Sequence, residues 1–198
     1  MKQITLFIVG ILFSSASLAQ KKIESLKISW PEEYNWKTLA SHDDKKTGLV
    51  EMIPAAEKPD KWTIFATMMS FKDVKIVSTN KVVQTYKESS RKESPRTSLT
   101  VLENNDSAAH KYVIFKIETE SFPEDPRPES QLYYSVQGES TLYVNFVAVR
   151  EKELSGDFVS KWTKIFKGAE FVYKDAAAGK SGTESAKKES SEKKDKKK

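Results

Sequence analysis

The stretch PESQLYYSVQGESTLYVNFVAV, residues 128–149, decides the fold. It contains two runs in which apolar and polar side chains alternate, which is the period of a β-strand. The tetrapeptide QGES separates the two runs, and its Gly138 can adopt the positive φ angle that tight turns often require. The pattern therefore predicts a β-hairpin with Gly138 in its turn.

Each arm of this hairpin has a strongly apolar face and a mixed face that carries tyrosine. Counting positions along each arm places Tyr134 and Phe146 on the core face, and Tyr133 and Tyr143 on the opposite face. If the sheet carries a site, we expect it on the tyrosine side. If a helix covers that side, the stretch has only a structural role and the function lies elsewhere. The candidate ligand-binding residues are Tyr133, Tyr143, Asn145 and Gln137.

Further strands are predicted before the hairpin. The segments YNWKTLAS and TGLVEMIP, residues 34–41 and 47–54, flank a charged turn and predict a first hairpin. The apolar positions of KWTIFATMMSF, residues 61–71, fit both a helix and a strand, and their tryptophan, threonine and phenylalanine content favours a strand. Residues 98–103 and 111–119 predict two more strands. The second is apolar at nearly every position, so we expect it to be covered on both faces.

Two helices complete the pattern. Residues 73–92 predict a helix with Asp73 as its N-cap. A second helix is expected to begin after Ser155 or Asp157 and to end at Gly168, before a last short strand. Its apolar stripe indicates packing against a sheet and consists of Phe158, Trp162, Ile165 and Phe166. The predicted fold class is α+β, a mostly antiparallel sheet with two principal helices packed on it.

The ends of the chain differ in composition from its middle. Residues 1–19 have one lysine, a short apolar run and small residues at the end, which is the pattern of a cleaved signal peptide. The run is too short to cross a bilayer of about 30 Å, so no transmembrane segment is expected after cleavage. Residues 20–173 predict a single domain, and the Lys/Glu/Ser-rich residues 174–198 predict a disordered tail. We therefore expect an exported protein, either periplasmic or extracellular.

The charge balance argues against one class of partner. The tail holds nine lysines and five acidic residues, and Lys2 lies in the signal peptide, so a net charge of +5 leaves the domain close to neutral. A basic face for nucleic acid is therefore not expected. The tail can contact anionic surfaces, or it can be simply solvated. The absence of cysteine excludes disulfides and thiolate chemistry.

Catalytic motifs are sparse. The turn residues His42, Asp43 and Asp44 form a weak alternative metal site, although such a turn is ordinarily just solvated. No nucleotide-binding glycine motif and no nucleophile elbow occurs, so no cofactor is expected. Paired carboxylates can perform acid and base chemistry, and the candidates for that role are Glu118, Glu120, Glu124, Asp125 and Glu129.

Several segments carry a resemblance to known proteins. SWPEEYNWKTLAS, EMIPAAEKPDKWTIFATMMS, the hairpin and the final helix with FVSKWTKIFK resemble a family of small exported bacterial proteins that has no assigned activity. More distantly, the order of elements is similar to the PsbP-like α/β/α sandwich. The resemblance implies a sandwich fold, and it transfers no functional residue because such folds host unrelated roles.

These observations favour an exported, non-catalytic binding or accessory protein of the cell envelope. Its partner would be an envelope component or another protein, because tyrosine and tryptophan are suited to interfaces. Two alternatives remain at this stage, a carboxylate-based hydrolase and a structural envelope protein whose tail anchors it by charge.

Overall fold

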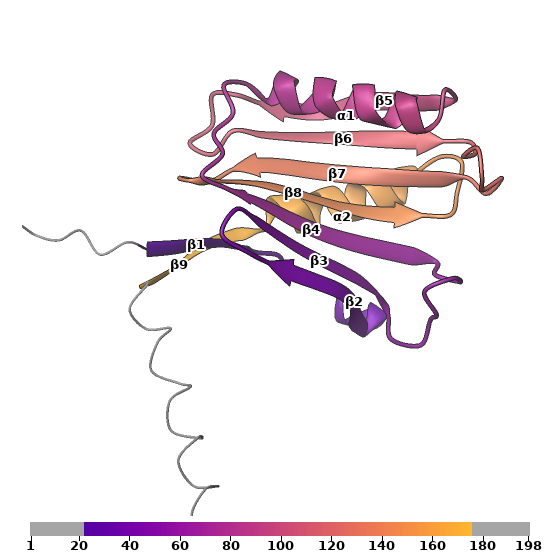
Figure 1. Cartoon of the computed structure of the whole chain (residues 1–198), viewed down its shortest axis with the longest axis horizontal. Coiled ribbons are helices and arrows are strands. Elements are labelled where there is room, and N and C mark those ends of the chain that lie inside the picture. Colours follow the sequence, from indigo (N-terminus) through magenta and orange to yellow (C-terminus); the bar gives the residue numbers. More distant parts are fainter. Residues whose placement is uncertain (1–21, 176–198) are drawn as a thin grey trace, which may run out of the picture. The chain divides into compact units, whose positions relative to one another are not determined.

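The computed structural model describes residues 22–175, of which Glu24–Tyr173 form one compact unit. Seven antiparallel strands form the main sheet in the order β2-β3-β4-β8-β7-β6-β5 (Figure 1). Helices α1 and α2 pack on opposite faces of this sheet and bury separate apolar clusters. The arrangement confirms the predicted α+β class.

The elements have the following bounds. The main sheet contains β2 (Trp36–Asp43), β3 (Thr47–Pro54), β4 (Ile64–Lys72), β5 (Thr97–Asn105), β6 (Tyr112–Thr119), β7 (Glu129–Gln137) and β8 (Thr141–Val149). The helices are α1 (Thr79–Glu93), α2 (Gly156–Lys167) and the short 3-10 helix η1 (Glu32–Tyr34). A separate two-stranded sheet contains β1 (Lys22–Lys27) and β9 (Glu170–Asp175).

Most predicted elements are present, with shifted ends. Strand β1 was not expected, because its charged sequence KIESLK carries little apolar alternation. Strand β9 continues past Tyr173, the last residue of the predicted domain. The predicted signal peptide, residues 1–19, lies outside the described residues, and so do residues 176–198 of the predicted tail.

The segment with two competing periodicities is strand β4. Its Ala66 and Met68 pack with the cluster on the α2 side, whereas Met69 and Phe71 pack with the cluster on the α1 side. Both faces of β4 are therefore apolar, which explains why its sequence also fits a helical stripe.

The opening stretch forms the β7–β8 hairpin, as predicted, but its faces were assigned wrongly. Tyr133 lies directly opposite Phe146, and Tyr143 lies opposite Val136. Residues that are directly opposite share a face, so Tyr133 and Tyr143 lie on opposite faces of the sheet. The source of the error is the turn. Its length determines which residues of the two strands lie opposite each other, and therefore which residues share a face.

Gly138 also has a different role from the predicted one. No glycine among the described residues has a positive φ angle. Instead, a Cβ atom at Gly138 would overlap the carboxylate of Glu24. That carboxylate accepts a hydrogen bond from the Glu139 N–H at 2.6 Å. Glycine is needed here because strand β1 approaches the hairpin turn closely.

Helix α1 begins later than predicted. Asp73 has φ 58° and is not the N-cap. The N-cap is Ser78, whose side chain accepts from the Asn80 N–H at 3.2 Å. Asp106 from the loop after β5 accepts from the Ser78 hydroxyl at 2.7 Å and from the Thr79 N–H at 2.9 Å. This carboxylate adds to the N-terminal cap, so residues 73–78 form a loop and not a first helical turn.

Helix α2 agrees with its prediction. Its N-cap Ser155 accepts from the Phe158 N–H at 3.2 Å, and Gly168 closes its C-terminus. The helix buries Trp162 completely among aromatic rings from the N-terminal segment and from α2 itself. The rings within 6.5 Å of Trp162, centroid to centroid, are those of Trp30, Tyr34, Trp36, Phe158 and Phe166.

Both edge strands of the main sheet are irregular. The register of β2 shifts between Thr38 and Ala40, and that of β5 shifts between Val101 and Glu103. Each shift is a β-bulge, which bends the strand locally.

No helix among residues 22–175 is long and apolar enough to cross a membrane.

Replacing Trp162 by alanine should lower the free energy of unfolding by about 3–5 kcal/mol, because a fully buried indole leaves a large cavity. Urea denaturation followed by circular dichroism measures this loss. Trp62→Ala is the matched control, since Trp62 is only partly buried and packs under the Arg150 guanidinium. We expect it to cost about 1 kcal/mol. Equal losses in the two variants would contradict the central role of Trp162.

Candidate ligand-binding site

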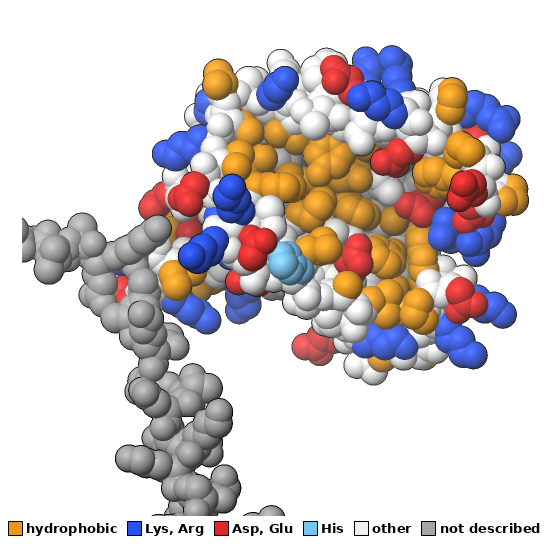
Figure 2. All heavy atoms as spheres, viewed as in Figure 1, with side chains coloured by type: hydrophobic (Ala, Val, Ile, Leu, Met, Phe, Trp, Pro, Cys, Tyr) orange, Lys and Arg blue, Asp and Glu red, His pale blue; other side chains and the backbone are white. Residues whose placement is uncertain are grey.

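An apolar cavity of about 420 Å³ lies beside α1, over the adjoining part of β4 and β8. Figure 2 shows the hydrophobic side chains that gather on the sheet face below α1. Helix α1 contacts β5 and β6 and leaves this side of β4 and β8 without a helix above it (Figure 1). The cavity is lined by Phe71, Val74, Ile76, Lys81, Val82, Thr85, Tyr86, Ser89, Leu142 and Val144.

Three local patterns bring these side chains together. Leu142 and Val144 alternate on β8 and point to the same face as Phe71 of β4, which lies opposite Leu142. On α1, Val82 and Tyr86 are four residues apart and share a side of the helix. The small side chains of that helix, such as Thr85 and Ser89, leave space that larger residues would fill.

The loop of residues 73–78 forms one wall of the cavity and is held by Gln137. The Gln137 amide accepts from the Ile76 N–H at 2.9 Å and donates to the Val74 carbonyl at 3.1 Å. Lys111 donates to the Val77 carbonyl at 2.8 Å. Gln137, a predicted ligand-binding residue, thus fixes the wall of the cavity and is absent from its lining.

Tyr133, another predicted site residue, supports the cavity from behind. Its ring packs 4.9 Å from that of Tyr86 and stacks on Phe115 at 4.8 Å. Its hydroxyl donates to Gln131 at 2.7 Å.

Burial raises the pKa of Tyr86 to about 12, so this phenol stays neutral at physiological pH. A smaller hollow of about 100 Å³ lies beside the cavity and shares Tyr86 and Ser89 with it.

The remaining predicted residues, Tyr143 and Asn145, lie on the other face of the sheet. They line a groove of about 220 Å³ whose apolar lining includes Val50 and Met68. Among the described residues, the Asn145 Nδ2 and the Tyr143 hydroxyl have no hydrogen-bond partner. Burial raises the pKa of Tyr143 to about 12, and the nearby Glu24 carboxylate adds to the rise. The four predicted residues therefore do not form one site.

Replacing Asn145 by leucine should raise the free energy of unfolding by about 1 kcal/mol, because a buried amide without a partner is costly. Asn145 is only 2% exposed. Chemical denaturation measures the change. Asn104→Leu is the control, since its amide oxygen accepts from the Thr79 hydroxyl at 2.9 Å and its loss should destabilise. If Asn145→Leu destabilises the protein by more than Asn104→Leu, the Asn145 amide is paired.

The turn proposed as a weak metal site is closed by its own hydrogen bonds. Asp44 accepts from the Thr47 N–H at 2.7 Å, from His42 at 3.0 Å and from the Lys46 N–H at 2.6 Å. These bonds lower the pKa of Asp44, the Thr47 N–H most strongly. Asp43 pairs with Lys72 at 2.5 Å. Within residues 22–175, no group of three or more histidine, cysteine, aspartate or glutamate side chains is arranged to hold a metal ion.

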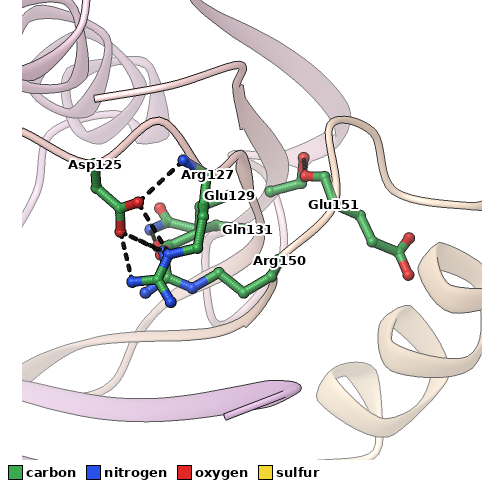
Figure 3. Close-up of polar contacts among 7 residues, drawn as sticks. Asp125, Arg127, Glu129, Gln131, Arg150 and Glu151 are labelled. Atoms are coloured by element: carbon green, nitrogen blue, oxygen red, sulfur yellow. Dashed lines mark hydrogen bonds and ion pairs between the residues drawn. The ribbon is translucent and has the colours of Figure 1, made fainter. Parts of the chain in front are cut away.

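Two of the carboxylates considered for hydrolysis share a network with arginine. Figure 3 shows Asp125 and Glu129 beside the guanidinium groups of Arg127 and Arg150. Arg127 donates to both oxygens of Asp125, and Arg150 donates to Glu129 at 3.0 Å. The hydrogen bonds from Arg127 lower the pKa of Asp125 to about 2. Asp125 is therefore ionised at neutral pH and is a poor general acid.

The other carboxylates lie apart from this network. Glu118 accepts from Lys116 at 2.8 Å and from the Leu154 N–H at 2.9 Å. Glu120 lies 3.9 Å from Arg96. Glu124 is exposed in the loop that follows. Glu118 and Glu120 thus have partners typical of turns and ion pairs, so the structure adds no support for carboxylate chemistry.

Sequence reasoning missed the cavity residues, Lys81 and Tyr86 above all. The pattern of residues 73–92 predicted only a helix packed on the sheet, and the stripe of Val82, Val83 and Tyr86 does pack with residues of β6. The short side chains beside that stripe, Thr85 and Ser89, were the feature of the sequence that could have indicated a cavity.

In comparisons with known proteins, no family model matches the chain and no curated protein matches it.

Proposed function

We propose that the protein is an exported, non-catalytic binding module of the cell envelope, and that the cavity beside α1 is its binding site. The main observation that supports this proposal is the cavity. Its volume of about 420 Å³ and its mostly apolar lining with a few polar groups are typical of small-molecule sites. Export is supported by the N-terminal sequence pattern of residues 1–19.

The chemistry of the lining supports binding in preference to catalysis. Among the described residues that line the cavity, the polar groups are the hydroxyls of Thr85, Tyr86 and Ser89 and the amine of Lys81. The Thr85 hydroxyl already donates to the Lys81 carbonyl at 2.9 Å. The described residues of the lining include neither a carboxylate nor an imidazole that could act as a general base beside a hydroxyl nucleophile.

Binding can be tested with 1-aminoanthracene, a neutral apolar fluorophore whose emission rises in an apolar site. We expect saturable binding of one molecule per chain. Thr85→Trp should weaken binding at least about tenfold by filling the cavity, a change of about 1.4 kcal/mol. Gln84→Trp is the matched control, since Gln84 is exposed on the same helix and does not line the cavity. Absence of saturable binding, or equal binding by both variants, would overturn the proposed site.

Export has its own test. The protein recovered from the periplasmic or secreted fraction should begin at Gln20, because the small residues before it suit signal peptidase. Intact-mass spectrometry measures this directly. Recovery of the chain in the cytosolic fraction with residues 1–19 still attached would contradict export and leave the binding site itself untouched.

A further inference from the structure

Lys81 is the single charged residue among the described residues that line the cavity. It lies near the start of α1, and the residue as a whole is exposed. A lysine that both lines a cavity and is exposed places its apolar stem along the wall and its ammonium group at the mouth. The cavity therefore has one positively charged end.

No protein group among residues 22–175 neutralises this ammonium group through an ion pair or a hydrogen bond. Two of the nearby lysines are engaged, since Lys72 pairs with Asp43 and Lys111 donates to the Val77 carbonyl. The carboxylate that caps α1, Asp106, is engaged by Ser78 and Thr79. Lys81 is thus available to a ligand.

The spacing of the lining residues along α1 gives the length of the cavity. Lys81, Thr85 and Ser89 all line it and are spaced by four residues along α1. Eight residues of α-helix advance by about 12 Å. An extended saturated chain of about ten carbons has this length, given C–C bonds of about 1.5 Å. The apolar side chains of Phe71, Leu142 and Val144 form the opposite wall.

We infer that the ligand of this cavity is an amphiphile with one apolar chain and an anionic oxygen-acid head, and that the head pairs with Lys81. This inference rests on the proposed function, since it needs the cavity to be a binding site. The chain would displace water from the apolar wall, which drives association. The charged head, bonded to an ammonium group at the partly desolvated mouth, determines the orientation of the chain.

The test compares ligands that share a ten-carbon chain and differ in the head. Decanoate, decyl phosphate, decan-1-ol and decylamine are each used to displace 1-aminoanthracene from the full-length protein, below their micellar concentrations. We expect both anions to bind at least about tenfold more tightly than the alcohol, as for a hydrogen bond to a charged group. Decylamine should bind most weakly. The ratio of the two anions distinguishes a carboxylate ligand from a phosphate ligand.

Lys81→Gln should remove the preference for the anions, so that the anions and the alcohol bind this variant with equal affinity. Lys87→Gln is the matched control, because Lys87 lies on the same helix and does not line the cavity. Equal binding of alcohol and anions, or preferred binding of the amine, would overturn the inference while the proposed binding function stands. If neither the alcohol, the anions nor the fluorophore binds, both fail.

Discussion

The pairing of Gln137 with Leu142 across the β7–β8 turn determines the surroundings of every residue in the middle of the sheet. With this register, Tyr133, Leu142 and Val144 face α1, whereas Tyr134 and Tyr143 face the α2 side. A slip by one residue would exchange the two sets on one strand. The apolar floor of the cavity and the aromatic packing around Trp162 therefore both depend on this turn.

The two faces of the sheet are covered to different extents. On one face, α2 packs over β7 with the aromatic residues around Trp162. On the other, α1 packs over β5 and β6, and no helix within residues 22–175 packs over β4 and β8 on that side. The cavity is the consequence of this offset. Gln137 completes the cavity wall, because its side-chain amide binds two segments at once. It accepts from the Ile76 N–H in the loop of residues 73–78 and donates to the Thr141 carbonyl at the hairpin turn.

Local signals in the sequence predicted the elements well. Ser155 and Gly168 mark the ends of α2 because capping depends on residues next to the helix. The predicted start of α1 was wrong because Ser78, and not Asp73, is the N-cap, and Asp106, distant in sequence, adds to that cap. The face of Tyr143 and the space beside Lys81 could not be predicted, since both depend on register and helix placement, which arise only when separate elements pack together.

The bulges in β2 and β5 interrupt the free edges of the main sheet. A long, regular edge strand offers unpaired N–H and C=O groups to a strand of another molecule, and this is a route to aggregation and domain swapping. With each edge bent near its middle, neither offers an uninterrupted run for such pairing. The two bulges therefore oppose extension of the main sheet by a strand of a second molecule.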